Sequence, residues 1–257
     1  MIGVFDSGVG GLTVLNELRR QMPRRDFLYL ADTARFPYGS KPPQTVQGFV
    51  REAIDFLCDE GVEAIVLACN TASAAALPGV KAACGVSIWG MVDAGVEAAT
   101  RATYNGHVAV IATEGTIASG VFQRKLQSRG LQVWAQACPA LAEAVEDGTD
   151  DAEELARHCL REMPRADTLL LGCTHFARVR GPIERVAGPR VRVVDGAAVL
   201  ARGVAEELED EGSGRVRYYV TGRAGAFAGR LNACPTGLVQ QVSLSEIRRG
   251  VEIVHVD

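Results

Sequence analysis

The 257-residue sequence has only three lysines, Lys41, Lys81 and Lys125, among its 27 basic residues. A Schiff-base catalyst or a lysine-bound cofactor therefore has few possible anchor points. An excess of positive charge is also absent, because 31 acidic residues give a formal net charge of −4. This charge balance favours a small or polar ligand over nucleic acid or an anionic membrane.

Long hydrophobic runs are missing as well. The longest apolar stretches, Ala64–Cys69 and Thr168–Cys173, are far shorter than the roughly 18 residues of a membrane-spanning helix. The first residues contain Asp6 and no basic region, which is unlike a secretory signal, so we expect a cytoplasmic protein. An odd, scattered set of seven cysteines in such a chain predicts reduced thiols. These are Cys58, Cys69, Cys84, Cys138, Cys159, Cys173 and Cys234.

Short apolar segments alternate with longer amphipathic ones. This alternation predicts an α/β fold with mostly parallel sheets and helices on both faces. The expected strands are Ile2–Phe5, Phe27–Leu30, Ala64–Ala68, Ser87–Val92, His107–Ala112, Gln132–Ala135, Thr168–Gly172 and Val191–Val194. The expected helices include Leu12–Gln21, Pro43–Glu60, Ile117–Arg129 and Asp151–Met163.

A weak internal repeat relates the two halves of the chain. Ala64–Thr71 parallels Thr168–His175, and Gly90–Gly95 parallels Arg192–Ala197 at nearly the same offset. The sequence therefore predicts two pseudo-symmetric, doubly wound α/β domains with an active site in the cleft between them. We expect residues 1–96 and 206–257, the latter a tail that packs back on the first half, to form one domain and residues 97–205 the other.

Two cysteines occupy corresponding positions of the repeat. Cys69 and Cys173 each follow an expected parallel strand, at the end of a sheet where ligands bind in α/β folds. Either thiol taken alone is better explained as a buried packing residue. As a pair flanking one cleft, they would suit a reaction that removes a proton from one face of a carbon atom and returns one to the other.

Other polar residues near expected strand ends could assist such a transfer. Asp6 and His175 are ionisable, although a turn or capping role for Asp6 and an ordinary loop position for His175 explain them too. The glycines of Phe5–Gly11 could bring backbone N–H groups close to an anion, either a carboxylate or a phosphate. The loop Arg35–Pro43 offers Tyr38, Gly39 and Ser40 as further contacts.

The sequence resembles the glutamate racemases of the cofactor-independent aspartate/glutamate racemase group. The resemblance spans almost the whole chain and is carried by Ile2–Leu15, Ala31–Lys41, Val66–Ala74, Ser119–Leu126, Ala137–Pro139 and Leu169–Phe176. It implies that L- and D-glutamate are interconverted by two-base proton transfer at the α-carbon, which supplies D-glutamate for peptidoglycan and cell-wall biogenesis.

The resemblance also implies roles for individual residues. Cys69 would serve the D-enantiomer and Cys173 the L-enantiomer, with Asp6 and His175 assisting them. The implied substrate contacts are Asp6, Ser7, Tyr38, Gly39, Asn70, Thr71, Thr113, Thr116, Thr174 and His175. Neither a metal, a nucleotide nor pyridoxal phosphate is expected as cofactor, and glutamate is the expected small-molecule partner of a homodimer that needs neither nucleic acid nor a membrane.

The chain departs from the family pattern at Ala94, Ala112, Gly115 and Ala177, which affects the expected shape of the pocket but none of the proton-transfer groups. Two alternatives stay open. One is aspartate racemase or a related thiol-based isomerase, and the other is a non-catalytic regulatory protein with the same fold. A nucleotide-binding role for Asp6–Gly11 is disfavoured, because no metal or ribose motif accompanies it.

Overall fold

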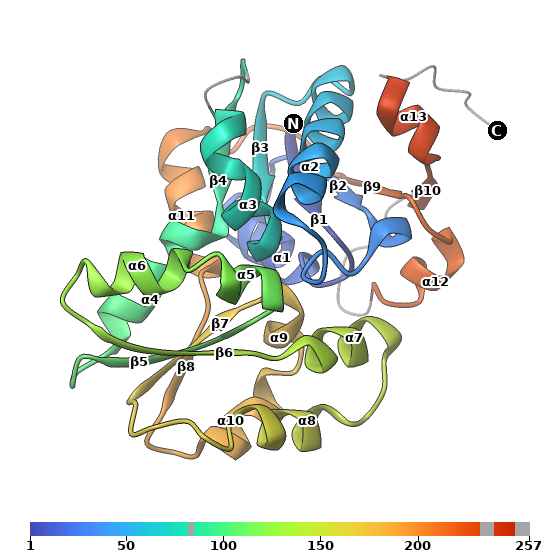
Figure 1. Ribbon diagram of the computed structural model, residues 1–257. Helices are drawn as coiled ribbons and strands as arrows, with labels where there is room; N and C mark the ends of the chain where they lie inside the picture. The colour runs from blue at the N-terminus through green and yellow to red at the C-terminus, as the bar shows by residue number, and fades with distance from the viewer. Residues whose placement is uncertain (82–84, 232–238, 250–257) are drawn as a thin grey trace.

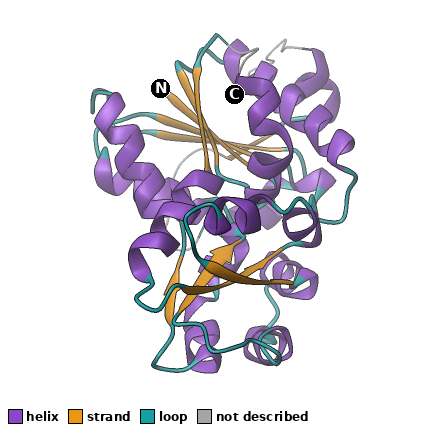
Figure 2. Ribbon diagram, turned by 60° about the vertical axis from the view of Figure 1, so that its left-hand side comes forward, coloured by secondary structure: helices purple, strands orange, loops and turns teal. Residues whose placement is uncertain are grey.

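The computed structural model describes residues 1–81, 85–231 and 239–249, and it contains two parallel sheets, one in the upper and one in the lower part of the molecule as drawn (Figures 1 and 2). The strands of the first sheet are β1 (Ile2–Asp6), β2 (Phe27–Ala31), β3 (Ala64–Leu67), β4 (Ser87–Gly90), β9 (Val216–Val220) and β10 (Val239–Gln241). Those of the second are β5 (His107–Ala112), β6 (Gln132–Ala137), β7 (Thr168–Gly172) and β8 (Arg192–Val194).

The two sheets share the same strand order. The first runs β10-β9-β2-β1-β3-β4 and the second β6-β5-β7-β8, so β1 to β4 and β5 to β8 are arranged alike. Every strand pair in both sheets is parallel, for example Ile2 opposite Phe27 and His107 opposite Gln132. The predicted α/β fold with two similar halves is therefore confirmed, and β3 and β7, which precede the two cysteines, are equivalent strands.

Helices cover both faces of the two sheets (Figure 2). The α-helices are α1 (Leu12–Gln21), α2 (Pro43–Asp59), α3 (Asn70–Lys81), α4 (Met91–Ala102), α5 (Glu114–Ala118), α6 (Val121–Gln127), α7 (Pro139–Asp147), α8 (Ala152–Cys159), α9 (Thr174–Arg178), α10 (Arg180–Ala187), α11 (Ala197–Glu207), α12 (Ala224–Ala228) and α13 (Leu244–Arg249). One short 3-10 helix, η1, spans Thr33–Arg35. In the described part of the chain, no helix combines the length and apolar character needed to cross a bilayer.

The helix predicted over Ile117–Arg129 is wrong as a single element. The structure has two short helices, α5 and α6, separated at Gly120, which adopts a φ of 64°. This left-handed conformation favours glycine and cannot continue an α-helix. The separate helix α5 starts just after Thr113, and Thr113 and Thr116 both contact the Thr71 hydroxyl of α3.

The C-terminal tail, α4 and α11 bear on where one half ends and the other begins. Strand β9 of the tail pairs with β2, with Val216 opposite Phe27. Helix α4 contributes Met91 to the core of the first sheet and Val96 to that of the second. We propose the division into two domains, residues 1–96 with 206–257 and residues 97–205, with one change. Because Leu200 of α11 packs in the first core, the second domain should end before α11.

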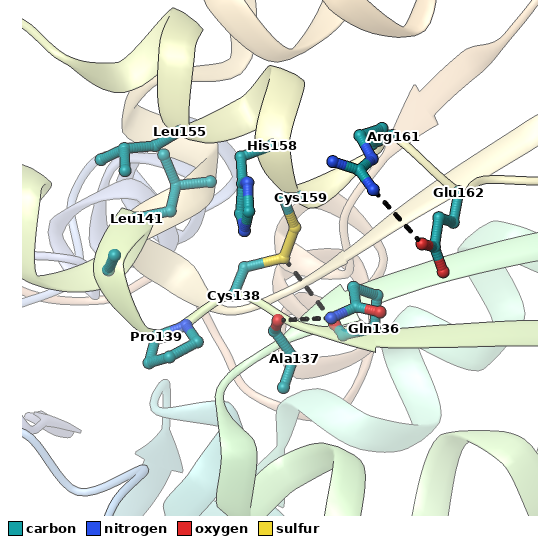
Figure 3. A pocket seen from close by; sticks show the side chains of 11 residues that line it. Gln136, Ala137, Cys138, Pro139, Leu141, Leu155, His158, Cys159, Arg161 and Glu162 are labelled. Carbon is teal, nitrogen blue, oxygen red and sulfur yellow. Dashed lines mark hydrogen bonds and ion pairs between the residues drawn. A yellow bond between two sulfur atoms is a disulfide. The ribbon is translucent and has the colours of Figure 1, made fainter.

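Two of the cysteines expected to be reduced are joined in the structure. Cys138 and Cys159 form a disulfide with their Cα atoms 5.8 Å apart, a normal separation for this bond. Figure 3 shows the bond beside a cavity of about 380 Å³ that His158 and Arg161 also line. The prediction of seven reduced thiols is therefore wrong for this pair, while Cys58, Cys69 and Cys173 remain thiols; Cys84 and Cys234 lie outside the described residues.

Candidate active site

The predicted site residues gather around a small cavity between the two sheets. Its volume is about 20 Å³, close to the space of one water molecule. The lining residues come from the carboxyl ends of strands and the loops after them, in both halves: Ser7, Phe36, Pro37, Tyr38, Gly39, Cys69, Asn70, Thr71, Thr113, Ala142, Cys173, Thr174 and His175. Both candidate thiols, Cys69 from the first half and Cys173 from the second, therefore border the same space.

Cys69 lies in surroundings that keep its thiol protonated. Burial and the nearby charge of Asp6 raise its pKa to about 12, against a hydrogen bond from the Ala72 backbone that lowers it. The Ser7 hydroxyl is 3.6 Å from the Cys69 sulfur. The start of α3 thus offers the thiol a backbone N–H group, as expected for a helix N-terminus, but burial has the larger effect.

Cys173 has the opposite kind of neighbour. Its sulfur lies 3.9 Å from Nδ1 of His175, and Nε2 of the same ring lies 2.7 Å from Oε2 of Glu146. Burial alone would lower the pKa of His175, but hydrogen bonds to Cys173 and Glu146 outweigh it and raise this pKa to about 10. The site therefore places a protonated imidazole within reach of the Cys173 sulfur.

Glu146 is a site residue that the sequence analysis missed. It lies near the end of α7, and its Oε2 accepts hydrogen bonds from the backbone N–H of Val9, at 3.0 Å, and from His175. Burial would raise the pKa of this carboxyl, but the contacts with His175 and Val9 bring it below its usual value. No local sequence pattern marks Glu146, because only the packing of α7 on α9 brings it to His175.

Asp6 lies fully buried at the end of β1, where it does not line the cavity, unlike the prediction, but contacts Thr174, which does. Its carboxylate accepts hydrogen bonds from the Gly8 backbone, at 2.9 Å, and from the Thr174 hydroxyl, at 3.1 Å. Burial raises the pKa of Asp6 to about 6, although His175 and these hydrogen bonds act in the opposite direction. Asp6 is therefore a carboxyl that can hold or release a proton near neutral pH.

The loop Phe5–Gly11 binds carboxylates of the protein itself. Gly8 N–H donates to Asp6 and Val9 N–H donates to Glu146. The anions that this loop approaches in the structure are thus two carboxylates of the protein. Its glycines allow close packing: a Cβ on Gly8 would lie 2.4 Å from Oε2 of Glu146, and one on Gly10 would lie 2.5 Å from Nδ1 of His175. The glycines therefore let this loop of the first half contact the acid and the imidazole of the second.

Hydroxyl and amide groups make up the opposite wall. The hydroxyls of Thr71, Thr113 and Thr116 are joined pairwise by hydrogen bonds of 2.8 to 3.1 Å that link α3 to α5. Asn70 is buried, and within the described structure its Nδ2 has no hydrogen-bond partner. A buried donor without an acceptor is costly unless a ligand supplies one, so a carboxylate at Asn70 would satisfy it.

Three predicted contacts are arranged differently from the expectation. Tyr38 lines the cavity, but its hydroxyl donates to Asp32 instead of pointing at a ligand. Thr116 is fully buried behind Thr71 and Thr113, and it does not line the cavity. Ser40 is exposed and lies outside the site.

The two thiols are thus chemically unlike. Burial keeps the Cys69 sulfur a neutral thiol, which can give a proton, whereas the Cys173 sulfur lies beside the His175 imidazole, a group that can exchange a proton with it. Among the described residues, no three His, Cys, Asp or Glu side chains come together in a way that could hold a metal ion. The fold and this site define a class of α/β protein in which two cysteines, one from each of two similar halves, border the same small cavity.

Comparison with known proteins places the chain in a family. A family model described as Asp/Glu/Hydantoin racemase matches residues 2–204, and the chain belongs to this family. It is 44% identical to a glutamate racemase of Thermus thermophilus, with 96% of this chain and 97% of that protein aligned. A crystal structure of a glutamate racemase isoform from Bacillus anthracis superposes with a TM-score of 0.89 at 33% identity, covering 95% of this chain and 97% of the other.

An aspartate racemase of Picrophilus torridus is much less similar. It superposes with a TM-score of 0.59 at 16% identity, covering 80% of this chain and 93% of the other. At this level of identity the likeness shows a shared fold alone.

Proposed function

We propose that this protein is a glutamate racemase, an isomerase that interconverts L- and D-glutamate by moving a proton between two thiols. The observation that carries the proposal is the cavity between the halves, which Cys69 and Cys173 both line from equivalent strand ends. Two thiols from opposite halves fit the deprotonation of a carbon on one face and its reprotonation on the other.

The proposed reaction from L-glutamate begins at Cys173. The Cys173 thiolate, beside the protonated His175, removes the α-proton, and the Cys69 thiol delivers its own proton to the opposite face. Cys69 is then the thiolate and Cys173 the thiol, which is the arrangement required to convert D-glutamate back. Asp6, whose pKa of about 6 lies near neutrality, assists proton exchange at the Cys69 side.

The polar wall is proposed to bind the two carboxylates and the amino group of glutamate. Asn70 Nδ2 lacks a partner among the described residues and is available to a carboxylate, and the hydroxyls of Ser7, Thr71, Thr113 and Thr174 can rotate to donate or accept. Asp6 and His175 complete the proposed contacts, together with the Gly39 and Tyr38 segment. Thr116 would act by orienting the other two threonine hydroxyls.

Substrate choice is the direct test of this proposal. The purified protein should racemise L-glutamate at a kcat/KM at least about tenfold above that for L-aspartate, because a pocket built for one chain length loses binding energy with a shorter one. Chiral chromatography of both reactions measures the difference. Faster turnover of L-aspartate would show the sister activity instead, and the absence of turnover of either would support a non-catalytic role.

The proposed chemistry requires no metal, nucleotide or pyridoxal phosphate. Racemisation should therefore continue at an unchanged rate after dialysis against a chelator. The D-glutamate produced would supply peptidoglycan synthesis in the cytoplasm. We also propose a homodimer, and light scattering on the purified protein tests it by the molar mass.

A further inference from the structure

Arg230 lies in the C-terminal tail, just after a segment that is fixed to the first half. Phe227 of α12 packs in the first core and stacks on Tyr29, with ring centroids 5.9 Å apart. The Tyr29 hydroxyl in turn donates to the carbonyl of Gly8 at 2.8 Å, in the loop that follows Asp6. Helix α12, which directly precedes Arg230, is therefore fixed through Tyr29 to the loop that follows Asp6.

From this base, Arg230 contacts two helices of the second half. Its Nη2 donates to the carbonyl of Asp147 at the end of α7, and its own carbonyl accepts a hydrogen bond of 3.3 Å from Arg178 at the end of α9. Figure 1 shows the tail near α12 above α7, at the junction of the halves. Helix α7 carries Glu146 and helix α9 carries His175. Arg230 therefore contacts both helices that hold the Glu146–His175 pair.

The guanidinium also lies close against the end of α7. Gly148, which ends this helix with a φ of 74°, would bring a Cβ to 1.8 Å from Nη1 of Arg230. A side chain there would displace the guanidinium, so the glycine provides both the left-handed turn and the space for Arg230. A cation at this end of a helix is favoured by the helix dipole and by the free carbonyls.

The charge of Arg230 acts on Glu146 as well. Burial raises the pKa of the Glu146 carboxyl, but the hydrogen bonds from His175 and Val9 and the positive charges of His175 and Arg230 together bring it below its usual value. Arg230 and Glu146 also line one and the same cavity at the surface of the junction. Together with the hydrogen bond to Cys173, an ionised Glu146 raises the pKa of the His175 imidazole.

We propose that Arg230 is a positioning residue for the racemase site, which fastens α7 and α9 to the tail and holds the Glu146–His175 pair aligned and ionised. This inference rests on the proposed function for its role in turnover. It concerns the tail beyond residue 204, where the match to the family model ends. Arg230 itself touches neither the cavity with the thiols nor a reacting atom.

The test compares Arg230→Gln and Arg230→Lys with the unsubstituted protein. Arg223→Gln is the matched control, because Arg223 is an exposed arginine of the same segment and lines the same surface cavity. Arg230→Gln should lower kcat/KM for L-glutamate about tenfold, the effect of losing one charge-assisted hydrogen bond. It should also move the acid limb of the pH profile of kcat/KM to higher pH, because Glu146 becomes easier to protonate.

The other variants separate charge from packing. Arg230→Lys should keep the acid limb of the unsubstituted protein, since it keeps the charge, and Arg223→Gln should keep both rate and profile. An unchanged profile in Arg230→Gln would overturn the proposal. If Arg230→Gln and Arg230→Lys then lose activity equally with this unchanged profile, the role of Arg230 is purely structural.

A second readout makes the inference independent of turnover. In NMR titrations of the His175 ring nitrogens, the inflection caused by Glu146 should lie at higher pH in Arg230→Gln than in the unsubstituted protein. If the unsubstituted protein does not racemise glutamate, the proposed function fails while this titration still tests Arg230. Identical titration curves would overturn the role of Arg230 even in an active racemase.

Discussion

At the scale of single residues, the site contains charged groups that are buried at a cost in stability. Asp6 is fully buried and has its pKa raised from 3.8 to about 6, so above that pH the folded protein holds a charge that the unfolded chain exposes to water. Hydrogen bonds from Gly8 and Thr174 offset only part of the lost hydration. Such a residue is better explained by proton chemistry than by stability.

Asp6→Asn is therefore expected to stabilise the protein at pH 8. The difference between a pKa of 3.8 and one of about 6 corresponds to roughly 3 kcal/mol in the free energy of unfolding. The amide can still accept from Gly8 and can donate to Thr174. The gain should disappear below about pH 4, where the carboxyl is protonated in both states. Urea unfolding at pH 8 and pH 4 measures it.

Asp26→Asn is the control for this measurement, because it should change the free energy of unfolding in the opposite direction. Burial raises the pKa of the Asp26 carboxyl, but the hydrogen bonds that it accepts from Arg215 and Ser213 together outweigh burial and bring this pKa below its usual value. Its replacement should lower the free energy of unfolding at pH 8. A loss of stability at pH 8 in Asp6→Asn as well would contradict the account of Asp6.

Residues adjacent to a strand end could be predicted from the sequence. Cys69 and Cys173 were identified by the repeat, and both line the cavity together with most of the predicted contacts. Glu146 could not be predicted, because it lies 29 positions from His175 and at the far end of a helix from the Cys138-Pro139 motif. The direction of the Tyr38 hydroxyl depends on Asp32, a contact that no local pattern encodes.

At the scale of elements, α7 is the helix that completes the site. It supplies Ala142 to the wall of the cavity and Glu146 to His175, and Glu146 also accepts from Val9 of the first half. The position of α7 therefore controls both the protonation of His175 and a contact between the halves.

Glu146→Gln should shift the alkaline limb of the pH profile of kcat/KM to lower pH. Hydrogen bonds to Cys173 and Glu146 raise the pKa of His175 to about 10, and the loss of the carboxylate removes one of these two contacts, so that burial lowers the pKa further. The imidazole then loses its proton at a lower pH, and kcat/KM at pH 8 should fall about a hundredfold. Initial rates across the pH range measure both effects.

Glu143→Gln is the matched control on the same helix, where Glu143 is exposed to solvent. Its rate and pH profile should equal those of the unsubstituted protein. An unshifted alkaline limb in Glu146→Gln would show that His175 does not depend on Glu146.

The sequence predicted most elements because apolar runs and helical spacing are local signals. Strands β5 and β7 and helix α1 have the predicted bounds. The break between α5 and α6 was missed because only the φ of Gly120 shows that the helix ends there. The Cys138–Cys159 disulfide was missed because it depends on the packing of α7 against α8.

At the scale of the whole molecule, the two halves meet closely over the site. The cavity of about 20 Å³ is far below the roughly 300 Å³ at the lower end of small-molecule sites, so the halves must move apart for a substrate to enter. Contacts across the junction include the 2.7 Å hydrogen bond from Gly115 N–H to the carbonyl of Gly39. Closure of this kind removes water from the reacting groups.

Gly39→Ala should interfere with closure. A Cβ at Gly39 would lie 2.4 Å from the Cβ of Thr113 across the junction, whereas one at Gly48 on α2 would meet nothing within 4 Å. Gly39→Ala should therefore raise KM for L-glutamate about tenfold or more, by an overlap that costs roughly 1–3 kcal/mol. Gly48→Ala, the control, should keep KM and gain up to about 1 kcal/mol of stability. An unchanged KM in Gly39→Ala would contradict the described closure.

Transfer between two thiols is the central claim, and racemisation of L-glutamate in D₂O tests it most directly. During the first turnovers, mass spectrometry of the separated enantiomers should show one α-deuterium in nearly all D-glutamate formed, while the remaining L-glutamate keeps its α-proton. This result is expected because Cys173 removes the proton and Cys69 returns one that has exchanged with solvent. D-glutamate that retains the original α-proton would contradict the account.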